Sequence, residues 1–150
     1  MDWISGLQRA IDYVETHIIE EINYEEVAKY AYSSSFYFQR VFSMICGYTL
    51  GDYIRFRRLT LAGSELIATD KKVIEIALKY GYDSPESFSR AFTKFHGVSP
   101  SSTRNGASIK SFSALSVKLI LSGGNLMNYR VEKREAFKII CKKQQVYKPQ

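Results

Sequence analysis

The sequence contains an internal repeat with an offset of 50 residues. Residues 27–47 align with residues 77–97, and eight of the 21 aligned positions hold the same residue. The shared pairs are Lys29/Lys79, Tyr30/Tyr80, Tyr32/Tyr82, Ser34/Ser84, Phe38/Phe88, Arg40/Arg90, Phe42/Phe92 and Gly47/Gly97. Because composition alone would not produce so many identities in register, we expect both copies to fold into the same supersecondary unit.

Each copy predicts a short helix, a tight turn and a second helix. The four helices are expected at about 24–31, 35–45, 73–80 and 85–95. Gly81 permits the positive φ that such turns often use, serine or aspartate can cap the second helix, and Gly47 and Gly97 are expected to end it. The sequence therefore predicts two helix-turn-helix units, over about 24–47 and 73–97.

Two further helices are predicted, one before the first copy and one between the two copies. Apolar residues recur at three- and four-residue steps over 2–20, opposite an acidic face that phosphate would repel. Residues 49–68 form one long helical pattern between the copies. About 20 helical residues span ~30 Å, and recognition helices one DNA turn apart need ~34 Å. We therefore expect a rigid linker helix that holds two recognition helices over successive major grooves.

The first turn of the second helix faces base edges in helix-turn-helix proteins, so outward residues there are candidate base contacts. Arginine can pair with guanine and glutamine with adenine through two hydrogen bonds, and an aromatic ring can contact a thymine methyl. Glu86 is expected to accept from a cytosine amino group or to repel phosphate, and local packing is an equal alternative for Phe36. The predicted base contacts are Ser35, Phe36, Gln39, Arg40, Glu86, Ser87, Ser89 and Arg90.

A second set of residues is predicted to contact DNA phosphates. Its members are Ser34, Arg55, Arg57, Arg58, Lys79, Ser84 and Lys94. Each of these residues also has an alternative structural role. The cations can lie on a solvated helix face, and the two serines can cap helices. The aromatic residues inside the copies are expected to form core rather than a platform for stacking bases; they are Phe38, Phe42, Phe88, Phe92 and Phe95.

The net charge of +6 does not by itself identify a nucleic-acid-binding protein. Residues 1–26 hold one base and seven acids, residues 27–104 hold eleven bases and six acids, and residues 105–150 hold nine bases and two acids. The segment with the repeat is therefore only moderately basic. The case for DNA depends on where its arginines lie rather than on total charge.

Other classes of function lack their motifs. His17 and His96 are isolated, Cys46 and Cys141 lie far apart, and no GxSxG, HExxH or P-loop pattern occurs. We therefore expect no enzyme activity, metal or cofactor. Free thiols suit a reducing compartment. Without an apolar run of ~20 residues or a signal peptide, the chain is expected to be cytoplasmic, associated with the nucleoid and without a membrane partner.

Two stretches resemble the AraC/XylS family of bacterial transcription regulators. Residues 81–100 (GYDSPESFSRAFTKFHGVSP) look like the family signature, and residues 53–59 (YIRFRRL) are similar to its linker helix. The resemblance covers about residues 4–104. It implies a seven-helix domain that contacts two adjacent major grooves, with RNA polymerase as a further partner. The base-contacting residues that it implies are Phe36, Gln39, Arg40, Glu86, Ser87, Ser89 and Arg90.

The pattern changes after Pro100. Residues 101–106 are small and polar, as in a linker, and residues 127–131 and 136–143 have the pattern of strands. These strands resemble the start of a GyrI-like effector-binding domain. We therefore expect a DNA-binding domain over 1–106 and the truncated start of an effector domain over 107–150. A small-molecule effector is implied only if a complete C-terminal domain exists.

The sequence thus predicts a mainly α fold, in which a seven-helix tandem helix-turn-helix domain precedes an incomplete β-containing segment. The predicted function is a sequence-specific, double-stranded DNA-binding transcription regulator, an activator that binds as a monomer. One alternative is a small-molecule sensor or interaction module whose DNA binding is vestigial. The other is an architectural DNA-binding protein without sequence preference.

Overall fold

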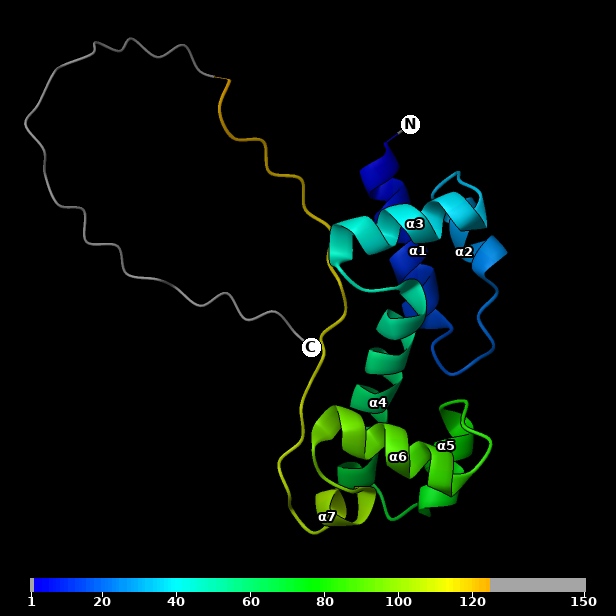
Figure 1. Cartoon of the computed structure of the whole chain (residues 1–150), viewed down its shortest axis with the longest axis vertical. Coiled ribbons are helices and arrows are strands. Elements are labelled where there is room, and N and C mark those ends of the chain that lie inside the picture. The colour runs from blue at the N-terminus through cyan, green and yellow to red at the C-terminus, as the bar shows by residue number, and fades with distance from the viewer. Residues whose placement is uncertain (1, 125–150) are drawn as a thin grey trace, which may run out of the picture. The chain divides into compact units, whose positions relative to one another are not determined.

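The structure is a computed structural model that describes residues 2–124. Over these residues the chain forms seven helices and no strand, which confirms the predicted mainly α fold. The helices are α1 (Trp3–Thr16), α2 (Tyr24–Tyr30), α3 (Ser35–Cys46), α4 (Leu50–Ala68), α5 (Val73–Lys79), α6 (Pro85–His96) and α7 (Pro100–Arg104) (Figure 1). The strands predicted at 127–131 and 136–143 lie outside the described residues.

Both copies of the repeat form a helix-turn-helix unit, α2–α3 and α5–α6. The hydroxyls of Ser34 and Ser84 cap α3 and α6 by accepting from the backbone N–H three residues further on. Gly47 and Gly97 end these helices with φ of 78° and 80°. In this left-handed conformation glycine avoids the strain that a Cβ would cause. The predicted ends of both helices are therefore confirmed to within one residue.

The two turns differ by one position. The left-handed residue is Gly81 in the second copy, with φ of 84°, but Tyr32 in the first, with φ of 52°. Ala31, which aligns with Gly81, instead ends α2 with φ of −96°. A Cβ on Gly81 would lie 3.0 Å from Nη1 of Arg58. The second turn therefore requires glycine for two reasons, its backbone conformation and the adjacent guanidinium group.

The interior consists of two hydrophobic clusters. The first joins α1, α2, α3 and the beginning of α4, and its largest buried side chains include Ile11, Phe38, Phe42 and Tyr53. The second joins the end of α4 to α5 and α6, and includes Leu66, Ile76, Phe88 and Phe92. Leu61 of α4 packs against both clusters. The predicted linker helix is thus a shared wall of two cores, which explains its rigid attachment to both copies.

Two local expectations are corrected by the structure. The first helix was expected over 2–20, but α1 ends at Thr16 because the chain turns at His17 and buries Ile18 in the first cluster. Residues 101–106 were expected to form a linker, but α7 begins at Pro100 and buries Thr103. Serine capping and a proline in the first turn allow this short helix despite its polar composition.

The chain after α7 packs against the helices as an extended segment. We call residues 109–117 the strap. Ile109 packs on the second cluster, and Phe112, Leu115 and Val117 pack on the first. Although the second domain was expected to begin at residue 107, the compact unit that contains the helices extends to Leu119. Partial burial of these four apolar side chains explains why the strap stays with this unit.

Candidate nucleic-acid interface

The outward faces of α3 and α6 carry matching side chains. Each face has a shallow hollow, and three positions that line it are equivalent in the repeat: 39 and 89, 40 and 90, 43 and 93. The lining residues are Phe36, Gln39, Arg40 and Ser43 on α3, and Ser89, Arg90, Thr93 and Lys94 on α6. Figure 1 shows these two helices near the two ends of α4. The fold therefore presents an arginine at the same position of two outward helix faces.

Arg40 and Arg90 are the only identical charged residues on these faces, and both are exposed. Within residues 2–124, neither guanidinium group takes part in a salt bridge. A free guanidinium offers five N–H donors in a planar fork that matches the N7 and O6 acceptors of guanine. Both arginines therefore remain available for the contact predicted from the repeat.

The remaining exposed residues give the two helices different chemistry. On α3, Phe36 is 76% exposed and Met44 is 77% exposed, so Phe36 does not have the local packing that was its alternative. The equivalent positions on α6 hold Glu86 and Lys94, which are also exposed. Apolar side chains can contact thymine methyls, whereas charged ones respond to phosphates and base amino groups. The α3 face is thus largely apolar and the α6 face largely charged.

Several predicted serines have structural partners instead. Ser35 is buried, and its hydroxyl accepts from Nε2 of Gln39 at 3.0 Å. The Ser87 hydroxyl donates to the Ser84 carbonyl at 2.9 Å. Ser34 and Ser84 cap α3 and α6, as their structural alternative proposed. We therefore correct the role of the buried Ser35 from a base contact to a residue that orients the amide of Gln39. The DNA contacts of Ser34, Ser84 and Ser87 stay predictions.

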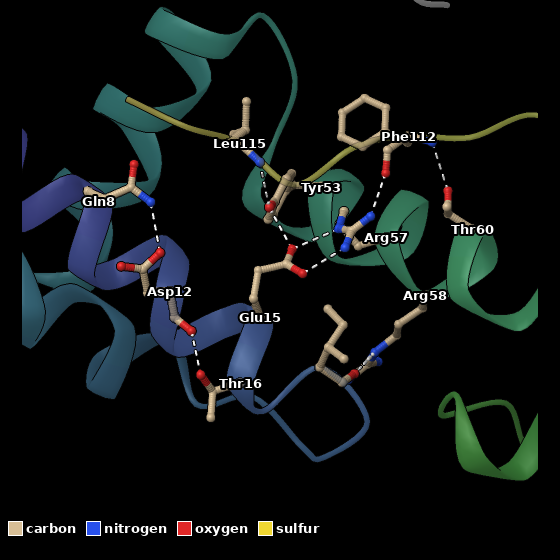
Figure 2. Close-up of polar contacts among 11 residues, drawn as sticks. Gln8, Asp12, Glu15, Thr16, Tyr53, Arg57, Arg58, Thr60, Phe112 and Leu115 are labelled. Carbon is tan, nitrogen blue, oxygen red and sulfur yellow. Dashed lines mark hydrogen bonds and ion pairs between the residues drawn. The ribbon is translucent and has the colours of Figure 1, made fainter. Parts of the chain in front are cut away.

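Arg57 points into the protein rather than toward solvent (Figure 2). Its Nε and Nη2 donate to the two carboxylate oxygens of Glu15 at 2.8 and 2.9 Å, and its Nη1 donates to the Phe112 carbonyl at 2.6 Å. Glu15 also accepts from the Tyr53 hydroxyl at 2.6 Å. Hydrogen bonding to Glu15 raises the pKa of Arg57. Because all its nitrogens face protein acceptors, we revise the expected phosphate contact: this arginine joins α1, α4 and the strap.

Arg58 is likewise directed inward. Its Nε and Nη2 donate to the carbonyls of Ile18 and Glu20 at 2.7 and 2.6 Å, while its Nη1 lies against Gly81. Burial lowers the pKa of this guanidinium. The side chain therefore bridges the segment after α1 and the turn between α5 and α6, and its expected phosphate contact is revised too.

Lys79 is held by a carboxylate at the end of α4. Its Nζ lies 2.7 Å from Glu65, which also accepts from Lys71 and Tyr80, each at 2.8 Å. Burial raises the pKa of Glu65, but these three donors outweigh it and lower the pKa to about 2. Arg55 pairs with Asp52 at 2.7 Å and stays half exposed. Of the cations expected to contact phosphate, Arg55 and Lys94 thus retain exposed charges.

Sequence reasoning missed two hydroxyl residues of this surface. Ser43 and Thr93 line the hollows on α3 and α6. They occupy equivalent positions three residues after the arginines, and residues three apart are neighbours on a helix face. The signal was therefore present in the repeat, although these positions are similar rather than identical. Tyr37, which is also exposed, has no such counterpart because residue 87 is a serine.

Neither a metal centre nor a membrane span is found in the part of the chain that the structure describes. Among residues 2–124, no three His, Cys, Asp or Glu side chains gather closely enough to hold a metal ion. None of the helices there is both long and apolar enough to cross a membrane.

Comparisons with known proteins show the family of the chain. A family model described as "Helix-turn-helix domain" matches residues 27–106, more than half of the chain. The solved structure of a transcriptional regulator from Chromobacterium violaceum, described as having an AraC-type DNA-binding domain, superposes with a TM-score of 0.62 at 26% identity, covering 67% of this chain and 89% of that one. The chain belongs to the AraC-type helix-turn-helix family of transcription regulators.

Similar proteins include the regulatory protein SoxS of Escherichia coli, 40% identical over 99 residues, which are 66% of this chain and 92% of SoxS. The transcriptional activator AarP of Providencia stuartii is 39% identical over 65% of this chain and 72% of its own. YbfP of Bacillus subtilis is 36% identical over 69% of this chain, which spans only 35% of YbfP. The DNA-binding domain of AdpA, solved with a target DNA, superposes with a TM-score of 0.60 at 27% identity, over 67% of this chain and 91% of that domain.

Proposed function

We propose that this AraC-type chain binds double-stranded DNA in a sequence-specific way, with α3 and α6 in adjacent major grooves, and thereby activates transcription. One observation carries the proposal: each second helix presents an exposed, unpaired arginine at the same repeat position, Arg40 on α3 and Arg90 on α6. The 19 residues of α4 join the two units. At 1.5 Å per residue this helix is ~28 Å long, close to the ~34 Å of one DNA turn.

Other observations support the same function. AdpA, a structural neighbour, was solved with DNA, and AarP is named as an activator. Because one chain supplies both recognition helices, we propose that it binds its site as a monomer. On the basis of the same family membership, we also propose a cytoplasmic location and a contact with RNA polymerase. A small-molecule effector belongs to the proposal only for a chain with a complete GyrI-like domain.

The different surfaces of the two helices predict different half-sites. We expect α3 to prefer a half-site with thymine methyls that contact Phe36, beside a guanine for Arg40. We expect binding of α6 to depend more strongly on salt, because Lys94 displaces counterions from a phosphate. Glu86 restricts the sequences that α6 accepts, because its carboxylate accepts from a cytosine amino group or repels a misplaced phosphate.

Selection of bound sequences from a random DNA pool tests the proposal. Two half-motifs should emerge about 10 base pairs apart. Arg40→Ala and Arg90→Ala should each weaken binding to the selected site by ~1–3 kcal/mol and relax the sequence preference within their own half-motif. Lys94→Ala should instead weaken all duplexes alike and reduce the salt dependence.

Lys71→Ala is the matched control, because it removes one positive charge from an exposed position that already pairs with Glu65. This variant should bind the selected duplex almost as the unaltered chain does. Equal affinity for selected and random DNA would contradict sequence-specific recognition and favour an architectural role. Identical effects of Arg90→Ala and Lys94→Ala on every duplex would contradict the assignment of base and phosphate contacts.

A further inference from the structure

The strap makes contacts with both copies of the repeat. Its backbone N–H groups, rather than its side chains, provide most of its polar contacts. Phe112 N donates to Thr60 Oγ1 at 3.0 Å, and Leu115 N donates to the Tyr53 hydroxyl at 3.1 Å. Two further bonds reach the ends of the unit, from Lys110 N to His96 Nδ1 at 3.1 Å and from Val117 N to Gln8 Oε1 at 2.7 Å. The strap is therefore tied to α6, α4 and α1 in turn, and Figure 2 shows its bonds to Tyr53, Arg57 and Thr60 of α4.

Aromatic packing connects the same elements. The Phe112 ring lies 5.6 Å from Tyr48, 6.0 Å from Tyr53 and 5.2 Å from Phe56, measured between ring centroids. Phe56 in turn stacks on Phe95 of α6 at 5.5 Å. The side chain of one strap residue thus completes a row of rings that runs from the end of α3 and the start of α4 to α6.

The side chains that the strap contacts are themselves held in place by further hydrogen bonds. Its donors meet side chains that are themselves fixed: the Tyr53 hydroxyl is bonded to Glu15, and Arg57 bonds both Glu15 and the Phe112 carbonyl. The His96 ring bonds the Leu59 carbonyl through Nε2 at 2.9 Å. No side-chain nitrogen or oxygen buried within residues 2–124 lacks a partner. Removing the strap would break four hydrogen bonds that its N–H groups donate and expose the apolar surface that it covers, which is costly.

From these contacts we propose that the strap positions the two helix-turn-helix units relative to each other and so sets the spacing of DNA half-sites that the protein accepts. The inference rests on the proposed function. α4 alone is a single helix, and helices bend. A second connection from α6 to α1 restricts this bending. Phe112 is a positioning residue: it acts on the DNA through the placement of α3 and α6, without touching a base.

A spacing series tests this role with the full chain. The selected half-motifs are placed at centre-to-centre distances from about 9 to 12 base pairs, and affinity is measured at each distance. The unaltered chain should prefer one distance sharply. Phe112→Ala should reduce that preference by about tenfold, because a looser connection lowers the effective concentration of the second unit at the preferred distance. Affinity for a duplex with a single half-motif should not change.

Two variants complete the design. Thr60→Val removes the acceptor of the Phe112 N–H with almost no change in volume, so it provides the same test if Phe112→Ala unfolds the chain. Ser113→Ala is the control, because Ser113 is an exposed strap residue; its spacing profile should match that of the unaltered chain. Circular dichroism and melting temperature check that the helices remain.

The possible results separate the two proposals. An unchanged spacing profile in both Phe112→Ala and Thr60→Val would overturn the role of the strap. Equal loss of affinity for single and paired half-motifs would also overturn it, because Phe112 would then support the recognition helices individually. Failure of the unaltered chain to bind any selected duplex would instead refute the proposed function, and the positioning role with it.

Discussion

Replacing Arg57 by alanine should destabilise the fold without altering contacts to DNA phosphates. The Arg57 and Glu15 side chains are only 12% and 22% exposed. Breaking a buried ion pair costs ~3–5 kcal/mol, whereas an exposed pair is worth ~0–1 kcal/mol. Because this pair lies between these limits and closer to the buried one, we expect Arg57→Ala to lower the free energy of unfolding by about 2–3 kcal/mol. Part of this loss comes from the Phe112 carbonyl, which also loses its donor.

Urea denaturation followed by circular dichroism measures this loss, and Arg55→Ala is the matched control. Arg55 lies on the same helix, but its side chain is 52% exposed and its partner Asp52 is three residues away. Its removal should cost no more than ~0.5 kcal/mol. A double-mutant cycle with Glu15→Ala should give a coupling energy of ~1 kcal/mol or more. If Arg57→Ala left stability unchanged but reduced the salt dependence of DNA binding, Arg57 would contact phosphate instead of the Glu15 carboxylate shown in Figure 2.

Three further predictions concern stability. Gly81→Ala should cost ~1–2 kcal/mol, measured as a lower melting temperature, and more than Gly47→Ala, which has open space around it; equal losses would argue against the role of Arg58. Glu65 has a pKa of about 2 in the fold and 4.5 when unperturbed, so its stabilisation should be present above pH 4.5 and fade as pH falls toward 2; Glu65→Gln should flatten this acid limb in pH-dependent unfolding. Burial lowers the pKa of His96 below 6.5, so stability should fall as pH drops below 6.5, and NMR titration of this ring above 6.5 would contradict the buried geometry.

The repeat predicted most of the helical framework. Identical Ser34/Ser84 and Gly47/Gly97 pairs marked where α3 and α6 begin and end, because caps and left-handed glycines act locally. Arg40/Arg90 pointed to the outward faces for the same reason: helical period alone decides which side of α3 or α6 a residue occupies. These features depend only on neighbours in sequence.

The features that sequence reasoning missed depend on distant partners. Arg57 and Arg58 sit on one helix with Arg55, and nothing local distinguishes a side chain that reaches Glu15 or Ile18 from one that reaches solvent. The strap was equally hard to predict, because its polar bonds use backbone N–H groups, which every residue except proline carries. The start of α7 was hidden by a run of serines whose composition is typical of a linker.

The shared wall formed by α4 also orders how the chain can open. Unfolding of α5 and α6 disrupts the packing of the second cluster only, whereas unfolding of α4 disrupts the packing of both clusters. Local unfolding follows the lowest free energy available. One copy should therefore be able to open while the other is still folded. In native-state hydrogen exchange, the amides in the middle of α4, around Leu61, should be the last to exchange.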